Sequence, residues 1–168
     1  MALPPKAKPG PNKPRLPASE APEFDAQAVR AQKARAAESL GPNDSERFVQ
    51  LAVQLLRDED VSGALAAAEV ATRCGPENFA AWVALGTALA RSKRFNDAAM
   101  AFLKAAGQSP DDVASWTDAG ECYVQLGDYE SAAQCLRQAM ENDPQAKHPA
   151  GRRARALVGR TISLLKRR

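Results

Sequence analysis

Apolar and polar residues follow helical spacing through the middle of the chain, and the whole pattern returns every 34 residues. Large aromatic rings recur one period apart at Trp82 and Trp116, and small residues do so at Gly86 and Gly120. Four prolines keep the same interval: Pro42, Pro76, Pro110 and Pro144. A repeat of this length predicts a solenoid of helix pairs, because one pair alone cannot bury its apolar face and needs its neighbours.

Each period contains the residues that a packed helical hairpin requires. The ring of the first helix and the small residue four positions later, such as Trp82 and Gly86, share one helix face. The small residue allows the second helix to approach, and that helix brings a large apolar residue such as Phe102. It also places alanine at the crossing in every unit, as Ala64, Ala98 and Ala132. Proline then ends the period, because it cannot continue a helix.

The order of these residues resembles the tetratricopeptide repeat, whose signature is a Trp, a Leu-Gly pair, a Tyr and then Ala, Phe and Pro. The likeness extends from Ser45 to Ala146 as three units, 45–78, 79–112 and 113–146. The last two units are close to the signature, and the first diverges from it. The resemblance implies an all-α fold, a right-handed α-solenoid of three helical hairpins.

The N-terminal part of the chain differs from the repeats. Residues 1–22 contain seven prolines and four basic side chains, and a segment with so little apolar surface is expected to be a disordered arm. Such an arm is a spacer, or alternatively a ligand for proline-reading modules. Residues 23–41 predict a leading helix, with Asp25 placed to cap its start and Gly41 to end it before the proline.

A second flanking helix is expected at residues 150–168, where it would cover the open face of the last repeat. Its apolar stripe is formed by Ala154, Leu157, Val158, Thr161, Ile162 and Leu165. From Lys147 onward there are eight basic side chains and no acidic one. We define the basic tail as Arg152, Arg153, Arg155, Arg160, Lys166, Arg167 and Arg168.

Charge is distributed unevenly, although the formal net charge is only +3. Residues 45–144 hold eight basic and fifteen acidic side chains, so an acidic body carries the basic tail. The tail suits an acidic partner or acidic residues of the chain itself, or it simply complements the negative end of a terminal helix. We expect no nucleic acid partner, because the acidic body repels phosphate and no aromatic residue lies within the tail.

The sequence indicates no enzymatic activity, no cofactor and no metal site. Cys74, Cys122 and Cys135 lack the paired spacings that hold zinc, and we interpret them as small buried apolar side chains. His148, the only histidine, is predicted to be a solvent-exposed linker residue. We expect a cytoplasmic protein, because the chain shows neither a secretory leader nor an apolar run long enough to span a membrane.

The inner face of the solenoid is the predicted binding surface. It is taken from the first helix of each unit, on the side opposite the buried rings. The predicted groove residues are Val49, Val53, Leu56, Arg57, Val83, Thr87, Ala90, Arg91, Thr117, Glu121, Val124 and Gln125. Such a trough suits an extended apolar peptide, because burial of anchor side chains supplies the binding free energy. The alternative is that the valines of this set only pack one repeat against the next.

Tetratricopeptide co-chaperones that hold the acidic C-terminus of a heat-shock protein clamp two carboxylates with Lys, Asn and Arg at such positions. Val49 and Val53 stand at the matching sites of the first unit. We therefore expect no carboxylate clamp in this chain.

The run AGECYVQLGDYESAAQCLRQAM, followed by ARALVGRTISLLK, resembles the last repeat and closing helix of the class II type III secretion chaperones. These small cytoplasmic bacterial proteins guard translocator subunits before export. The resemblance implies that the groove holds a linear segment of a membrane-active secreted protein and that the leading helix mediates homodimerisation. The alternative function is a structural adaptor in a larger bacterial assembly, which engages partners through its basic C-terminal helix.

Overall fold

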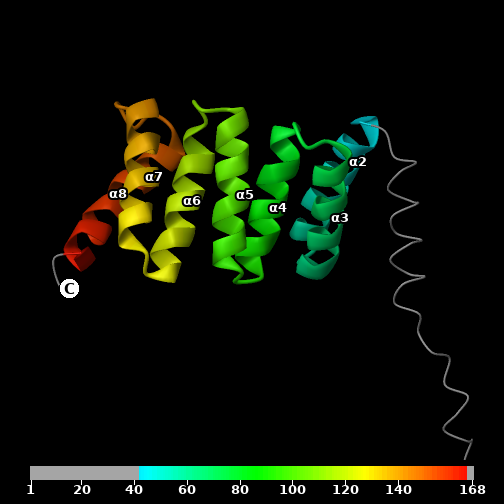
Figure 1. The fold of residues 1–168 in the computed structure, drawn as a ribbon, viewed down its shortest axis with the longest axis horizontal. Coiled ribbons are helices and arrows are strands. Elements are labelled where there is room, and N and C mark those ends of the chain that lie inside the picture. The colour runs from blue at the N-terminus through cyan, green and yellow to red at the C-terminus, as the bar shows by residue number, and fades with distance from the viewer. Residues whose placement is uncertain (1–41, 166–168) are drawn as a thin grey trace, which may run out of the picture.

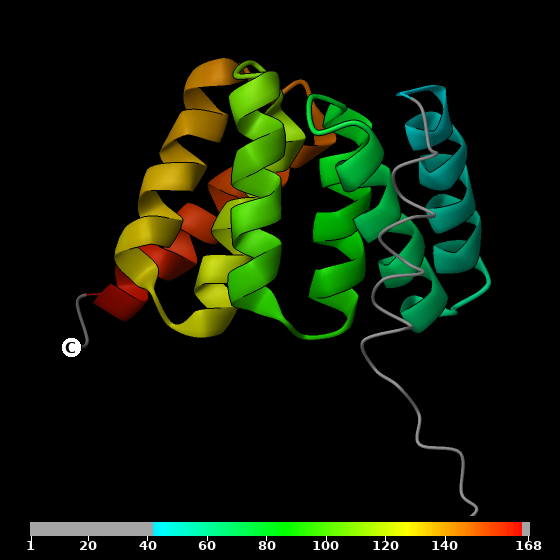
Figure 2. The ribbon, with the colours of Figure 1, turned by 45° about the vertical axis from the view of Figure 1, so that its right-hand side comes forward.

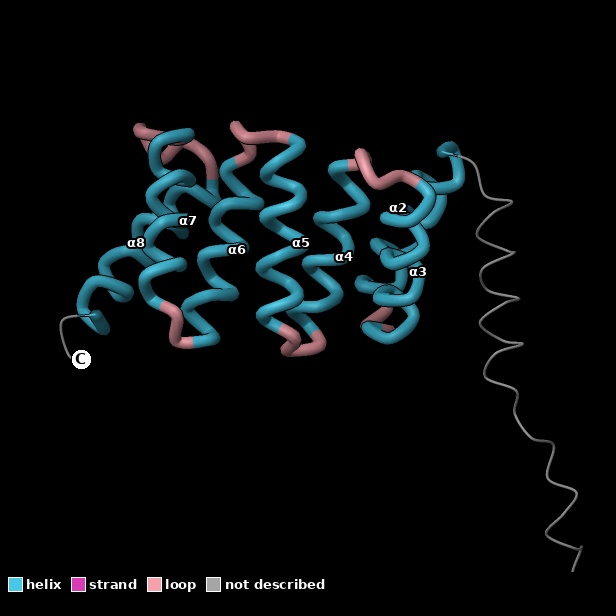
Figure 3. The backbone as a smooth tube through the Cα atoms, viewed as in Figure 1, coloured by secondary structure: helices cyan, strands magenta, loops and turns pink. Residues whose placement is uncertain are grey.

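The computed structural model describes residues 42–165, and all secondary structure in this range is helical (Figures 1 and 3). The helices are α2 (Pro42–Arg57), α3 (Val61–Cys74), α4 (Phe79–Arg91), α5 (Phe95–Gln108), α6 (Val113–Leu126), α7 (Tyr129–Asn142) and α8 (Pro149–Leu165). The predicted all-α solenoid of helical hairpins is confirmed. The arm of residues 1–22, the leading helix of residues 23–41 and the last three basic residues, Lys166, Arg167 and Arg168, lie outside the described residues.

Three helical hairpins stand side by side, α2 with α3, α4 with α5 and α6 with α7 (Figures 1 and 2). The second helix of each hairpin contacts the first helix of the next, so that α3 packs on α4 and α5 packs on α6. Helix α8 packs against α7 and α6 at the end of the stack. The last repeat is therefore covered by a closing helix, as the stripe of apolar residues predicts.

Small residues allow the two helices of a hairpin to touch. A Cβ atom added to Gly86 would lie 2.8 Å from the ring of Phe102, and one added to Gly120 would lie 2.7 Å from Leu136. At the same crossings the alanines of the second helices, Ala98 and Ala132, are fully buried. Any larger side chain would force the helices apart. These contacts explain why the repeat requires a small residue four positions after the ring.

The recurring tryptophan and proline form one hydrogen-bonded unit. The indole Nε1 of Trp82 donates to the carbonyl oxygen of Pro76 at 2.7 Å. The amide of Gln108, at the end of the second helix, donates to the same oxygen at 2.8 Å. The third unit repeats this arrangement with Trp116, Pro110 and Asn142. The proline therefore ends one unit and also accepts the hydrogen bonds that hold the next unit against it.

The turns inside the hairpins repeat as well. A residue with a left-handed backbone occurs at the same place in each period: Glu59 with φ 62°, Lys93 with φ 60° and Gly127 with φ 75°. Helices α3 and α7, which follow two of these turns, are capped by Asp60 and Asp128, whose side chains accept hydrogen bonds from the backbone amides of Gly63 and Ser131, whereas Arg94 at the start of α5 provides no side-chain cap. Local structure thus follows the period even where residue types change.

Candidate functional site

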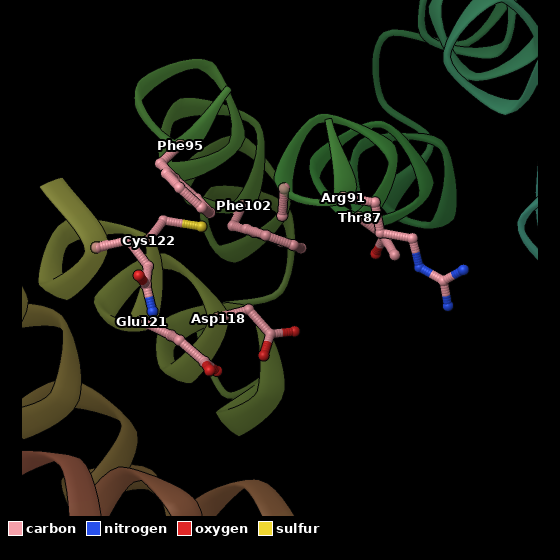
Figure 4. A pocket seen from close by; sticks show the side chains of 9 residues that line it. Thr87, Arg91, Phe95, Phe102, Asp118, Glu121 and Cys122 are labelled. Carbon is pink, nitrogen blue, oxygen red and sulfur yellow. The ribbon is translucent and has the colours of Figure 1, made fainter. Parts of the chain in front are cut away.

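A pocket of about 440 Å³ opens between α4 and α6, with α5 beneath it (Figure 4). Its lining comprises Thr87, Ala90 and Arg91 from α4, Phe95 and Phe102 from α5, and Asp118, Glu121, Cys122 and Gln125 from α6. Phe102 and Cys122 are almost fully buried. The base of the pocket is therefore apolar, and its polar groups stand around the opening.

The pocket results from a change of side-chain size between two equivalent positions. Leu56 stands one period before Ala90, and it is only 8% exposed because it packs with Ala64 and Ala88 between the first two hairpins. Alanine at position 90 leaves the corresponding space between the second and third hairpins unfilled. Consistent with this difference, α2 packs directly against α4, whereas α4 and α6 are joined mainly through α5.

One wall of the pocket is acidic and is contacted by the closing helix. The guanidinium group of Arg153 in α8 forms an ion pair and a hydrogen bond with the carboxylate of Asp118. Its Nε atom also lies 3.5 Å from Oε2 of Glu121. Burial raises the pKa of Asp118 to about 6, an effect that Arg153 opposes and the neighbouring carboxylate of Glu121 reinforces. Arg153 therefore supplies the positive charge that faces this wall.

The start of α8 is held in place by Asp143 and His148. The two carboxylate oxygens of Asp143 accept hydrogen bonds from the backbone amides of Lys147 at 3.0 Å and His148 at 2.8 Å. His148 is exposed, as predicted, and its Nδ1 accepts a hydrogen bond from the amide of Ala150 at 3.2 Å. A Cβ atom on Gly151 would collide with Asp143. These contacts fix α8 independently of Arg153.

The described part of the basic tail is directed largely at the protein itself. Arg152 donates to the carbonyl oxygens of Ala146 and Lys147, and Arg155 donates to that of Pro144. Arg153 contacts the acidic wall, and Arg160 is exposed on the same helix. In the apolar stripe, Ala154 and Thr161 are fully buried, whereas Ile162 is exposed.

Five of the predicted groove residues line the pocket: Thr87, Ala90, Arg91, Glu121 and Gln125. Five others lie outside it, with Val49, Val83 and Val124 half-buried and Val53 and Arg57 exposed. Most residues of the predicted inner face on α2, α4 and α6 are therefore at least partly accessible to solvent.

Two of the predicted groove residues are buried and cannot contact a ligand in this arrangement. Leu56 belongs to the packing between the first two hairpins. Thr117 is fully buried beneath α8, and its hydroxyl oxygen lies 2.7 Å from the carbonyl oxygen of Val113 and 3.3 Å from that of Ala150. The prediction placed both on an open trough, because a projection of one helix shows neither the packing of α2 on α4 nor the path of α8 across α6.

The pocket also contains four residues that the predicted groove omits: Phe95, Phe102, Asp118 and Cys122. The two phenylalanines follow the repeat pattern and are expected to pack inside a hairpin. The pattern does not indicate that one edge of each ring also faces a pocket. The signal that identifies them is the decrease in size from Leu56 to Ala90, since the smaller side chain leaves space beside the rings of α5. Comparison of equivalent positions between units therefore locates the pocket better than the polarity of one helix face.

Cys122 and Cys135 are buried and serve as packing residues. Burial raises the pKa of Cys122 to about 12, with Asp118 and Glu121 adding to the effect, and burial raises that of Cys135 to about 11. Within residues 42–165, His, Cys, Asp and Glu form no group suited to a metal ion. No helix of the described segment has the length and apolar character to cross a bilayer.

Comparison with known proteins identifies the repeats. A family model described as Tetratricopeptide repeat matches residues 49–113, and a second model with the same description matches residues 89–158. The two matches overlap and together span residues 49–158, from within α2 to the first part of α8. None of the curated proteins matches the chain in sequence.

Solved structures with low sequence identity share the fold. The first TPR of Spaghetti (RPAP3) bound to the HSP90 peptide SRMEEVD has a TM-score of 0.68 at 13% identity, covering 76% of this chain and 97% of that one. The TPR2B domain of yeast Sti1 in its pHsp70 complex has a TM-score of 0.66 at 19% identity, covering 71% and 97%. PcrH in complex with the chaperone binding region of PopD has a TM-score of 0.68 at 17% identity, covering 74% and 96%.

Proposed function

The chain belongs to the tetratricopeptide repeat family, and from this premise we propose that it is a non-enzymatic module that binds an extended, largely apolar peptide of a protein partner. The peptide lies on the face formed by α2, α4 and α6, which we call the groove. The observation that supports this function most directly is the pocket between α4 and α6, where the fold leaves an apolar hollow unfilled.

The composition of the pocket suits one anchor side chain of such a peptide. Phe95 and Phe102 supply an apolar base, and Thr87 and Gln125 supply hydrogen-bonding groups at the opening. Small-ligand and peptide-anchor sites generally combine an apolar hollow with a few convergent polar groups. Since ordering an extended peptide costs free energy, we expect micromolar binding.

We further propose that the protein is a cytoplasmic chaperone of a type III secretion substrate. The run from Ala119 to Met140 and the closing helix support this proposal through their resemblance to class II chaperones. PcrH, solved in complex with the chaperone binding region of PopD, shares the fold over 96% of its length. In this role the groove keeps a membrane-active client soluble, and the segment of residues 23–41, which the sequence predicts to be helical, mediates homodimerisation.

An acidic peptide is disfavoured as a ligand. The TPR of RPAP3 holds the HSP90 peptide SRMEEVD, which contains three acidic residues. In this chain Asp118 and Glu121 stand on the wall of the pocket, and their carboxylates would repel such a peptide. The adaptor alternative receives less support than the groove, since Arg152, Arg153 and Arg155 already donate to groups of the chain itself.

The proposal is tested by filling the pocket. Ala90→Leu copies the residue that closes the first junction, and Met100→Leu is a matched control on α5, where Met100 is 54% exposed. Wild-type protein and both variants are titrated against apolar peptides selected from a random linear peptide library, with fluorescence anisotropy as the readout. We expect Ala90→Leu to weaken binding about tenfold or more, and Met100→Leu to leave it unchanged.

Failure of the library to yield any linear ligand, or equal binding by Ala90→Leu and wild type, would refute groove binding. The chaperone role has a separate test. A protein with long apolar helices, encoded beside secretion components, is co-expressed with the chain. It is expected to co-purify in soluble form with wild type and to be lost with Ala90→Leu.

A further inference from the structure

We infer that the groove selects peptides that place an arginine or lysine beside an apolar anchor, and that Arg153 of α8 occupies this basic subsite in the absence of a client. The inference rests on the proposed peptide-binding function and adds the chemistry of the peptide. It depends on three features of the pocket: its acidic wall, the position of its other cation, and the way in which α8 is attached.

The acidic wall belongs to the same pocket as the apolar base. The side chains of Asp118 and Glu121 are 30% and 45% exposed, and they stand one helical turn apart on α6. Figure 4 shows both carboxylates on the α6 side of the pocket, with Phe95 and Phe102 between α6 and α4. A ligand in the pocket therefore meets an apolar surface and two negative groups together.

Arg91 does not neutralise this wall. Its Nη1 atom donates to the carbonyl oxygen of Leu56 at 2.7 Å, which directs the side chain toward the first junction. Figure 4 shows Arg91 extending away from Asp118 on the far side of the pocket. Among the described residues, the cation that lowers the pKa of Asp118 is Arg153. The charge balance of the pocket thus depends on one side chain from α8.

Arg153 can leave the wall without loss of the closing helix. Its side chain is about half exposed, whereas α8 is held by the buried residues Ala150, Ala154 and Thr161 and by the capping contacts of Asp143. A change of rotamer therefore releases the guanidinium group to solvent while the backbone stays in place. Arg153 is a removable side chain in an otherwise anchored helix.

The group that replaces Arg153 must itself be cationic. If an apolar side chain displaced it, the partly buried carboxylate of Asp118 would lose its partner, which is costly in free energy. An acidic side chain would add repulsion. An arginine or lysine of the peptide restores the charge-assisted hydrogen bonds, and its methylene stem can lie along the ring of Phe95. The adjacent apolar side chain then fills the space above Ala90.

The test uses two dipeptides of nearly equal size, N-acetyl-leucyl-arginine amide and N-acetyl-leucyl-citrulline amide, which differ in charge. Each is titrated into the full chain near neutral pH, and backbone amide shifts of pocket residues such as Cys122 and Gln125 are followed by NMR. In Arg153→Ala, where the competing side chain is removed, we expect the arginine probe to bind about fivefold or more tightly than the citrulline probe. In wild type the arginine probe is expected to bind more weakly than in Arg153→Ala.

Two variants provide the controls. Arg160→Ala removes the same charge from an exposed position of α8 and is expected to behave as wild type. Asp118→Asn combined with Glu121→Gln is expected to abolish the preference for the arginine probe. If Arg153→Ala does not reach the helical content of wild type, Arg153→Met keeps the stem without the charge and replaces it.

The outcomes separate this inference from the proposed function. Equal binding of the two probes to Arg153→Ala, with shifts confined to the pocket, would overturn the basic subsite and leave peptide binding intact. A preference for arginine that persists in the Asp118 and Glu121 double variant would also overturn it. A third outcome is that neither probe changes the amide shifts of pocket residues in any variant, while library peptides still bind. That result would overturn the basic subsite and leave peptide binding by the groove intact.

Discussion

The junction between the first and second hairpins is closed, whereas the junction between the second and third is open. In the first, Leu56 fills the space between α2 and α4, and Arg91 donates across it to the carbonyl oxygen of Leu56. In the second, alanine and glutamine stand at the equivalent positions, as Ala90 and Gln125, and a pocket remains. Two junctions between units of the same repeat thus differ, since one is filled by side chains and the other contains a pocket.

This difference shows which positions of the repeat are free to change. The contacts inside each hairpin use the same small residues, since Gly86 and Gly120 both lie directly against the second helix. Between hairpins, however, equivalent positions change from Leu56 to Ala90 and from Ala84 to Asp118. Packing within a unit maintains the fold, while the residues between units determine whether a ligand can enter.

The largest effect is expected from opening the closed junction. Leu56→Ala should reduce the free energy of unfolding by about 2–5 kcal/mol, because it removes buried methyl groups and leaves a cavity. Leu51→Ala, at a residue that is 46% exposed on the same helix, serves as the control and should cost less than about 1 kcal/mol. Urea unfolding measures both. A similar small loss in the two variants would mean that the first junction is not packed as described.

A smaller effect concerns the charge in the open junction. The pKa of Asp118 in the folded chain is about 6, above its ordinary value of 3.8, so the stability associated with its proton is present at low pH and is lost as pH rises through about 6. Wild type should gain about 1 kcal/mol relative to Asp118→Asn when the pH is lowered from about 7.5 to about 5.

Comparison of the two proteins removes the contributions of the other titrating groups, which they share. The groups that act on Asp118 are Arg153 from α8, together with Glu121 and Asp112. Parallel stability curves for wild type and Asp118→Asn across this pH range would show that burial does not shift the pKa of this carboxyl group.

The smallest effect is expected from copying the open junction into the closed one. Arg91→Gln introduces the residue type of Gln125 and removes the hydrogen bond to Leu56, which should cost about 0.5–1 kcal/mol. Arg57→Gln changes the equivalent exposed residue one period earlier and should cost less than about 0.5 kcal/mol. Thermal unfolding measures the stability of the two variants. Equal midpoints for Arg91→Gln and Arg57→Gln would mean that the hydrogen bond of Arg91 does not stabilise the fold.

Much of the fold could be predicted from the period alone. Gly86 and Phe102 meet as their spacing requires, because contacts inside a hairpin are local in sequence and are imposed by helical geometry. The closing helix was predicted for the same reason, from a stripe of residues that includes Ala154 and Thr161. Local periodicity was sufficient where the neighbouring element follows directly along the chain.

The binding surface was predicted only in part. Thr87, Ala90 and Glu121 do line a pocket, but Thr117 is covered by α8, whose path across α6 depends on the turn at Asp143 and not on any periodic pattern. Asp118 was not predicted, since its place in the pocket depends on the spacing between hairpins. The pattern of residues around one helix does not show which side chains line a surface that three helices share.

The position of α8 also limits how the protein can assemble. Ala154 stands one period after Gly120, so α8 occupies the place that the first helix of a fourth hairpin would take. Arg152, Arg155 and Arg160 are exposed on this half-repeat. Two such ends would meet with like charges, and their electrostatic repulsion opposes a dimer formed by two C-terminal faces.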